Sequence, residues 1–221
     1  MMSLSPTEEN YLKAIFKIAE KEKKAVGTNS IAKQMDTAAA SVTDMIKKLA
    51  DKDLINYEKY KGVSLTPAGN RAATSLIRKH RLWEVFLVNK LRFAWHQVHD
   101  IAEELEHIMS DELILRLDAF LDYPKFDPHG DPIPNAEGKF TLRTQMSLSD
   151  MTLLQSGVVL GVKEHQTEFL KHLTKLNIKL GSEIKILEIT DFDLSMRIHI
   201  DNKYEEVISK TISQNLLMKR N

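Results

Sequence analysis

The first 71 residues carry three amphipathic helical segments and then two short strand-like segments, and this order restricts the possible folds more than any other feature. Ser5–Glu8 has the pattern of a helix start, with a serine cap, a proline at the first helical position and a glutamate that closes a capping box. Apolar residues at intervals of three and four predict two further helices, over 28–35 and 38–51. Two short strands around a turn follow over 54–65. This order predicts a winged helix-turn-helix.

The third predicted helix has a surface suited to the major groove of DNA. It begins with small or hydroxylated residues, which permit close approach, and lysines follow on the same polar side. Lysines at the turn between the two strands would neutralise phosphates. The predicted DNA contacts are Ala39, Ala40, Ser41, Thr43, Asp44, Lys47, Lys48, Lys59 and Lys61. A helical subdomain with a solvated polar face would share part of this pattern.

Two helical segments farther along the chain carry histidine and glutamate on one face. His80 and Glu84 are four residues apart, which places them one turn from each other. A second stripe, at intervals of four, three and one, contains His99, Glu103, Glu106 and His107. Imidazole and carboxylate together are typical ligands of Mn²⁺, Fe²⁺, Co²⁺ or Zn²⁺. Each segment taken alone more often forms surface hydrogen bonds, but two such sets in one chain favour a metal site.

Composition narrows the class of protein. The chain has no cysteine, which excludes disulfides, thiolate zinc sites and iron–sulfur clusters and is typical of the reducing cytoplasm. Its start lacks the pattern of a signal peptide, and no apolar run is long enough to cross a membrane, so no membrane partner is expected. With 31 basic and 31 acidic side chains, the formal net charge is zero. The case for DNA binding therefore depends on the local pattern.

The remaining segments indicate two helices, an irregular linker and a small β-barrel. The helices are expected over 97–109 and 110–121. Four of the six prolines lie within 122–140, which predicts an irregular segment. The barrel is suggested by one short helix over 164–175 and by alternating segments over 184–189, 194–200 and 207–212.

Three motifs closely resemble the diphtheria toxin repressor and manganese transport regulator family of metal-dependent transcriptional repressors. They are HRLWE (His80–Glu84), VHDIAEELEHIMSDE (Val98–Glu112) and PHGDPIP (Pro128–Pro134). The resemblance covers nearly the whole chain and implies a mainly α fold with a small β component. The implied parts are a winged helix-turn-helix over 1–71, a helical metal-binding and dimerisation domain over 72–141, and an SH3-like (FeoA-like) barrel over 142–221.

The resemblance also implies a function and a set of ligands. It implies a cytoplasmic homodimer that binds palindromic operator DNA when a divalent metal is bound, and that controls genes of metal uptake and homeostasis. In that family, metal ties the N-terminal helix to the dimerisation domain and so sets the two recognition helices. Carried over by position, the ligands are Asn10, Glu103, Glu106 and His107 at a primary site, His80, Glu84 and His99 at a second site, and His165 and Glu168 from the barrel.

The sequence departs from the family pattern at three positions that bear on the metal. Asn10 stands where the family has Met or Asp, and Glu8 or Glu9 is an alternative ligand from the same helix. Lys13 stands where a manganese-type member has an acid, and Glu103 occupies the position that is Cys in iron-type members. Ligation by oxygen and imidazole without sulfur favours Mn²⁺, with Fe²⁺ close behind, and Co²⁺, Ni²⁺ or Zn²⁺ are expected to bind in vitro.

Two other functions are consistent with parts of the sequence. Glu104–His107 contains the Glu-x-x-His of di-iron carboxylate enzymes, but those enzymes need a second copy, and the sequence has none. It also lacks a phosphate loop, a His-Glu-x-x-His motif and a nucleophile elbow, so we expect neither an enzyme nor an organic cofactor. The other alternative is a winged-helix regulator with a non-metal effector, which would require an apolar pocket.

Overall fold

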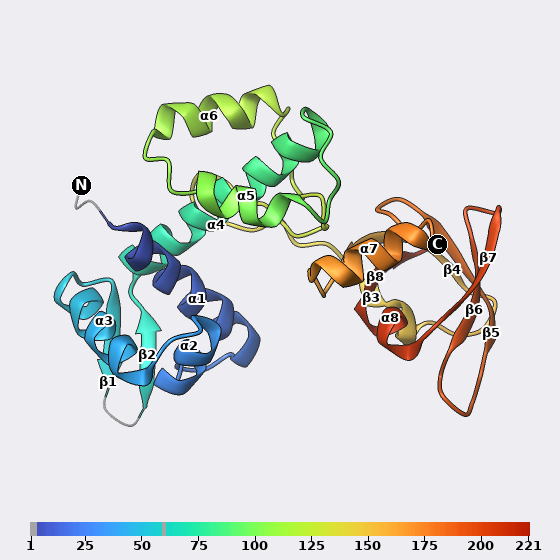
Figure 1. Ribbon diagram of the computed structural model, residues 1–221, viewed down its shortest axis with the longest axis horizontal. Coiled ribbons are helices and arrows are strands. Elements are labelled where there is room, and N and C mark those ends of the chain that lie inside the picture. Colours follow the sequence, from blue (N-terminus) through green and yellow to red (C-terminus); the bar gives the residue numbers. More distant parts are fainter. Residues whose placement is uncertain (1–3, 59–60) are drawn as a thin grey trace. The chain divides into compact units, whose positions relative to one another are not determined.

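The computed structural model describes residues 4–58 and 61–221 of the chain. Lys59, one of the predicted DNA contacts, lies outside the described residues. The chain forms two compact units (Figure 1). The first comprises the residues up to His80 together with Leu105–Ser110 and Pro134–Phe140, and the second comprises Arg81–Glu104, Asp111–Ile133 and Thr141–Asn221.

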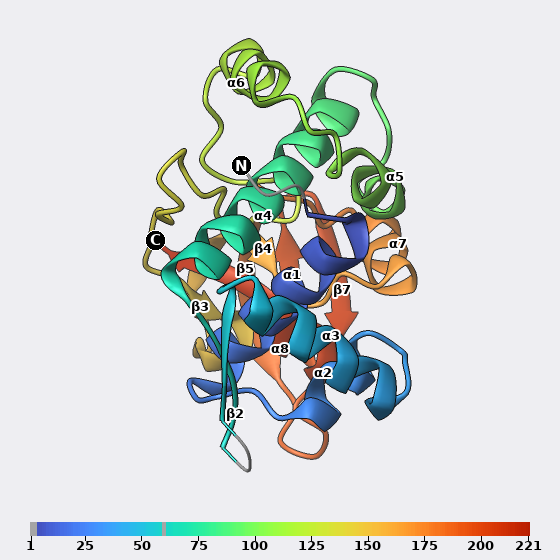
Figure 2. The same cartoon turned by 90° about the vertical axis from the view of Figure 1, so that its left-hand side faces the viewer.

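The first unit groups three helices beside a two-stranded ribbon (Figure 1 and Figure 2). Its elements are α1 (Pro6–Glu22), α2 (Thr28–Gln34), α3 (Ala39–Asp51), β1 (Ile55–Glu58), β2 (Gly62–Leu65) and the first part of α4 (Pro67–Asn89). The predicted capping box is present: the Ser5 hydroxyl accepts the Glu8 backbone N–H, and the Glu8 carboxylate accepts the Ser5 N–H. Leu12, Ile31 and Leu49 are fully buried in the core. Each such side chain contributes about 1.5–3 kcal/mol, so packing holds the helices in place.

The second unit combines helices with an antiparallel six-stranded sheet in the order β3-β8-β4-β5-β6-β7. Its core includes Leu148, Ile184 and Ile198, all fully buried. The elements after α4 are α5 (Val98–Leu105), α6 (Asp111–Phe120), β3 (Met146–Ser147), the 3₁₀ turn η1 (Leu148–Asp150), β4 (Ser156–Val162), α7 (Thr167–Lys175), β5 (Glu183–Ile189), β6 (Met196–Ile200), β7 (Tyr204–Ile208), α8 (Lys210–Asn215) and β8 (Leu216–Arg220). No helix among the described residues is long and apolar enough to cross a membrane.

The strand predicted over 207–212 is wrong. β7 ends at Ile208, and Ser209 then caps α8, since its hydroxyl accepts the backbone N–H of Ile212 at 3.4 Å. The alternating apolar residues in this stretch belong to a strand end and a short helix, both of which pack on one core. Local periodicity over six residues does not separate these two cases.

The helix predicted over 97–109 is also shorter than expected. α5 ends at Leu105, and Glu106 and His107 lie in the turn that follows. The prediction that all four residues of the second stripe lie on one helix is therefore wrong for Glu106 and His107. Glu106 is fully buried and makes long-range ion pairs, and these tertiary contacts override the local helical pattern.

Candidate metal centres and nucleic-acid interface

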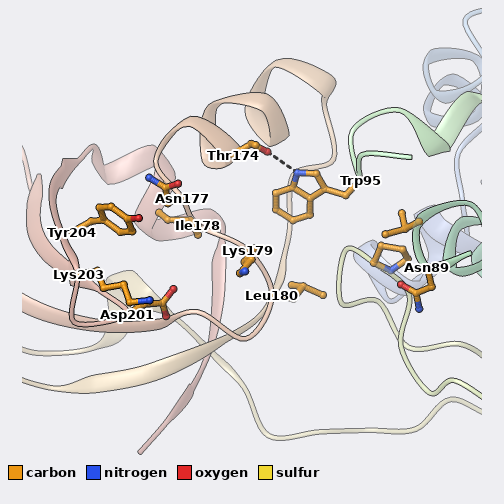
Figure 3. A pocket seen from close by; sticks show the side chains of 12 residues that line it. Asn89, Trp95, Thr174, Asn177, Ile178, Lys179, Leu180, Asp201, Lys203 and Tyr204 are labelled. Carbon is orange, nitrogen blue, oxygen red and sulfur yellow. Dashed lines mark hydrogen bonds between the residues drawn. The ribbon is translucent and has the colours of Figure 1, made fainter. Parts of the chain in front are cut away.

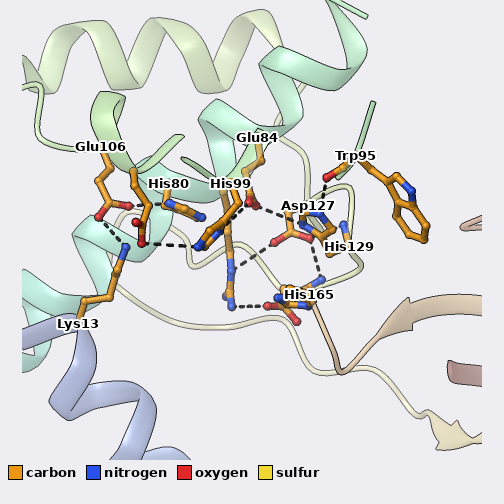
Figure 4. Close-up of polar contacts among 12 residues, drawn as sticks. Lys13, His80, Glu84, Trp95, His99, Glu106, Asp127, His129 and His165 are labelled. Atoms are coloured by element: carbon orange, nitrogen blue, oxygen red, sulfur yellow. Dashed lines mark hydrogen bonds and ion pairs between the residues drawn. The ribbon is translucent and has the colours of Figure 1, made fainter. Parts of the chain in front are cut away.

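The first cluster of ionisable side chains surrounds Glu106 in the first unit (Figure 4). Lys13 on α1 places its Nζ 2.6 Å from Oε1 of Glu106, and His80 on α4 places its Nδ1 2.6 Å from Oε2. Burial raises the pKa of Glu106, but the hydrogen bond from His80 and the charge of Lys13 outweigh it and lower the pKa. Glu106 is therefore a buried carboxylate whose two oxygens both have partners.

His107 and the first turns of α1 complete this cluster. Nδ1 of His107 lies 2.6 Å from Oε2 of Glu9, and its Nε2 lies 3.8 Å from Oε1 of Glu106. Nearby in sequence, the side-chain oxygen of Asn10 is buried and has no hydrogen-bond partner. Leaving such an oxygen unsatisfied costs about 1–3 kcal/mol, and a cation would satisfy it. Glu9 and Glu106 thus lie on opposite nitrogens of His107, and with Asn10 they offer oxygen and imidazole donors of the kind that a hard or borderline divalent metal binds.

Glu103 has a different partner from the one that the sequence suggested. It lies on α5 in the second unit, where its Oε1 is 3.6 Å from Nε2 of His99. The Glu103 side chain is 50% exposed. The other ring nitrogen of His99, Nδ1, lies 3.6 Å from Oε1 of Glu84. His99 therefore stands between two carboxylates.

The second cluster is centred on Glu84, which follows His80 by one turn on α4 and is buried. Its Oε2 lies 3.6 Å from Nδ1 of His129 (Figure 4). Glu84, Asp127 and His129 each offer one ligand atom, and these three atoms lie within 4.8 Å of one another. All three residues are buried. Sequence reasoning did not identify Asp127 and His129 as ligands, although they belong to the PHGDPIP segment and its preceding residue.

Hydrogen bonds within the proline-rich segment hold Asp127 and His129 in place. The backbone N–H groups of His129 and Asp131 donate to Oδ1 of Asp127 at 2.8 and 3.0 Å. Gly130 has φ +90°, and an added Cβ would lie 2.2 Å from the carbonyl oxygen of Leu160, so only glycine fits. The segment predicted to be irregular is therefore a fixed turn that presents a carboxylate and an imidazole.

The carboxylates of the second cluster favour positive charge at His129. Burial lowers the pKa of His129, but the carboxylates of Glu84 and Asp127 outweigh it and raise the pKa well above the usual range. Burial raises the pKa of Asp127, and repulsion by Glu84 and Asp131 adds to the rise. Nε2 of His129 donates to the carbonyl of Trp95 at 2.8 Å, which leaves Nδ1 facing Glu84. A metal-binding histidine is commonly oriented by such a bond from its other nitrogen.

Of the two ligands expected from the barrel, the structure places only His165 beside this cluster. Its ring centroid lies 5.0 Å from that of His129, and its Nε2 donates to the carbonyl of Val162 at 3.3 Å. Burial lowers the pKa of His165, which favours the neutral imidazole that binds metals. Glu168 is exposed on the first turn of α7.

A groove of about 600 Å³ in the second unit lies near Trp95 (Figure 3). Nε1 of Trp95 donates to the Thr174 hydroxyl at 2.9 Å across it. The lining residues are Val88, Asn89, Trp95, Pro128, Thr174, Asn177, Ile178, Lys179, Leu180, Asp201, Lys203 and Tyr204. Its walls mix apolar and charged side chains, so it is not the closed apolar pocket that an organic effector would require.

The predicted DNA contacts that the structure describes lie mostly on the exposed face of α3. Ala39, Ala40, Ser41, Asp44, Lys47 and Lys48 are exposed, and Thr43 is half-buried and donates its hydroxyl to the carbonyl of Ala39. In the ribbon, the exposed Lys61 forms an ion pair with Glu58 at 2.6 Å. A small-residue start followed by lysines is thus presented along one helix.

A buried carboxylate ties α3 to α1. Oε1 of Glu8 lies 2.6 Å from Nζ of Lys52 and 3.2 Å from Nζ of Lys48. Burial raises the pKa of Glu8, but hydrogen bonds from Lys52, Ser5 and Lys48 bring it down to about 2. The start of α1, which also carries Glu9 and Asn10, is therefore anchored to the C-terminal end of α3, the helix with the predicted DNA contacts.

Three family models match the chain in succession. They are described as the N-terminal DNA-binding domain of the iron-dependent repressor (residues 3–63), its metal-binding and dimerisation domain (66–135) and the FeoA domain (146–220). A solved manganese-dependent transcriptional repressor in complex with manganese is 33% identical, with a TM-score of 0.87, and the match covers 97% of this chain and 100% of that one. The chain belongs to the iron-dependent repressor family.

Other relatives carry names of the same kind. The solved manganese regulator SloR is 32% identical, with a TM-score of 0.73, and the match covers 99% of this chain and 100% of that one. The diphtheria toxin repressor of Corynebacterium jeikeium is 31% identical over 137 residues, which are 62% of this chain and 57% of that protein. Members of the iron-dependent repressor family are metal-dependent transcriptional repressors and not enzymes. The predicted fold class and the general function are confirmed.

Proposed function

We infer that this repressor binds palindromic operator DNA as a cytoplasmic homodimer when divalent metal is bound, and that it controls genes of metal uptake. The proposed domains span 1–71, 72–141 and 142–221. We propose Mn²⁺ as the physiological metal and Fe²⁺ as the close alternative. The absence of cysteine leaves oxygen and imidazole donors, and Mn²⁺ accepts such a set without sulfur. Relatives are named for either manganese or iron.

The observation that carries this proposal is the buried group of Glu84, Asp127 and His129, with ligand atoms within 4.8 Å of one another. The carboxylates of Glu84 and Asp131 repel that of Asp127, Arg81 offsets only part of this repulsion, and a divalent cation would relieve the remainder. His80, His99 and His165 are the further ligands proposed for the cluster around Glu84. Glu168 enters the proposal through the family resemblance alone.

A second proposed metal site consists of Glu106 and His107 with Asn10 or Glu9 from α1. The unpartnered oxygen of Asn10 supports it. Glu103 remains a proposed ligand here from the resemblance, and its Oε1 lies 3.6 Å from Nε2 of His99.

The proposed DNA interface is the exposed face of α3. Ala39, Ala40, Ser41, Thr43 and Asp44 would lie toward the bases, whereas Lys47, Lys48, Lys59 and Lys61 would meet phosphates. The proposed dimer interface includes α6 and the residues after it, because large apolar side chains are exposed there. These are Leu113, Leu115, Phe120 and Tyr123.

The proposed regulation is a linkage between ligand ordering and the recognition helix. A cation held by Glu106 and His107 together with Glu9 or Asn10 would tie the start of α1 to the turn after α5. Glu9 and Asn10 lie directly after Glu8, which holds Lys48 and Lys52 of the α3 region. Fixing the first turn of α1 therefore restrains α3 and raises the population of the DNA-competent form.

The experiment that tests this function is fluorescence anisotropy on DNA from upstream of the gene, with the chelator-stripped full chain. Mn²⁺ and, without oxygen, Fe²⁺ are titrated. We expect binding that appears with metal and reverses with chelator. Tight binding without metal, or no binding with any metal, would contradict the proposal and direct attention to a non-metal effector.

A further inference from the structure

Lys13 places a buried positive charge among the proposed metal ligands of the first unit. Its side chain is 8% exposed, and its Nζ lies 2.6 Å from Oε1 of Glu106, which has no exposed area. Lys13 follows Glu9 by four residues and Asn10 by three on α1, so all three side chains share one helix face. The ammonium therefore lies on the same side of α1 as the donors that would receive a cation.

Both oxygens of Glu106 already have partners. Oε2 accepts from Nδ1 of His80 at 2.6 Å, and Oε1 accepts from Lys13. A divalent cation that binds Oε1 would have to share this oxygen with the ammonium group of Lys13. Two positive charges that contact the same oxygen repel each other strongly in a buried site. Such a cation can bind there only if Lys13 moves away.

We propose that the ammonium of Lys13 is a built-in counter-ion that takes the place of a metal at Glu106 and must be displaced when this site binds a divalent cation. The pair holds α1 to the turn after α5 without metal. It also leaves the second oxygen of Glu106 to orient His80. Lys13 thus weakens metal binding at Glu106 and His107 and makes this part of the unit stable in the metal-free state.

This inference rests on the proposed function only in taking the cation to be a divalent metal. At the second cluster, the neighbouring cation is Arg81, which forms its shorter ion pair with Asp131, at 2.9 Å, and lies 3.5 Å from Asp127. The two clusters therefore differ in how closely a cationic side chain approaches a proposed ligand oxygen, at 2.6 Å for Lys13 and Glu106 and 3.5 Å for Arg81 and Asp127.

The test measures Mn²⁺ binding by the full chain through the electron paramagnetic resonance signal of free Mn²⁺. His129→Ala serves as the background, so that the second cluster does not dominate. Lys13→Met keeps the length of the side chain and removes its charge. We expect it to tighten Mn²⁺ binding about tenfold or more. Lys13→Arg retains the charge and is expected to leave the affinity weak.

Two controls locate the effect. Lys17→Met removes the same charge from an exposed position one turn later on α1 and should leave the affinity unchanged. Adding Glu106→Gln to Lys13→Met should abolish the gain. Equal Mn²⁺ affinity with Lys13 and with Met at this position, or an equal gain from Lys17→Met, would overturn the proposal.

A second measurement does not depend on the His129→Ala background. Without metal, Lys13→Met should lower the thermal unfolding midpoint, because the buried Glu106 loses one of its two partners. Saturating Mn²⁺ should then raise the midpoint more than it does in the unmodified chain. An equal rise in both proteins would contradict the role of Lys13. If Lys13→Met binds Mn²⁺ and the unmodified chain does not, the role of Lys13 is upheld and the proposed Mn²⁺ activation is refuted. If Mn²⁺ activates the unmodified chain and Lys13→Met has no effect, the proposed activation is upheld and the role of Lys13 is refuted.

Discussion

His129 is the residue on which the second cluster depends, because its two nitrogens have fixed and different tasks. Nε2 donates to the Trp95 carbonyl, and Nδ1 faces Glu84 at 3.6 Å. Loss of a group that merely orients a ligand typically weakens metal binding about 10–100-fold. We therefore expect His129→Ala to weaken Mn²⁺ binding at this cluster by about 100-fold or more. Equilibrium dialysis against buffered Mn²⁺ would measure it.

The matched control is His172→Ala, because His172 is an exposed histidine on α7 of the same unit. It should leave the affinity within a factor of about two, since surface substitutions away from a site have small effects. A similar loss in both variants would mean that His129 is not a ligand. An unchanged affinity in His129→Ala would remove the second cluster from the metal sites.

At the scale of elements, Glu8 joins α1 to α3, the proposed recognition helix. Glu8→Gln keeps the capping box, since glutamine also serves at this position, but removes the charge that Lys48 and Lys52 share. We expect the free energy of unfolding to fall by about 1–3 kcal/mol. Urea titration followed by circular dichroism measures it.

Glu58→Gln provides the comparison, because it removes the exposed ion pair with Lys61 in the ribbon. Exposed pairs of this kind contribute about 0–1 kcal/mol. If both variants lose the same stability, Glu8 is not an anchor between α1 and α3. A loss confined to Glu8→Gln, together with weaker DNA binding, would support the linkage from the first turn of α1 to the recognition helix.

The N-terminal elements could be predicted from the sequence to within one or two residues because their signals are local. The Ser5 cap and the apolar residues at intervals of three and four are signals contained within a single helix. The end of α5 could not, because it depends on Glu106, which meets His80 and Lys13 across 26 and 93 residues of chain. Asp127 and His129 lie in a segment without periodicity, so no helical or strand pattern marked them as partners of Glu84.

At the scale of the whole molecule, the proposed palindromic operator would require two copies of the chain, since each half of a palindrome is read by one winged helix. Leu115 on α6 is 56% exposed, so Leu115→Asp should leave the protomer folded while placing a charge in the proposed apolar interface. We expect dissociation to monomers in sedimentation equilibrium. Anisotropy at saturating Mn²⁺ should show at least about tenfold weaker operator binding, because each monomer then binds its half-site alone.

Leu153→Asp is the matched control, because Leu153 is 53% exposed and lies in a loop of the C-terminal part of the chain. It introduces the same charge at the same exposure and should alter neither the dimer nor the affinity for DNA. If Leu115→Asp also stays a dimer, the interface does not include α6. If Leu115→Asp becomes monomeric but binds the operator as tightly as the unmodified chain, dimerisation is not required for operator binding. Metal would then have to regulate DNA binding within each protomer, through Glu8 and α3.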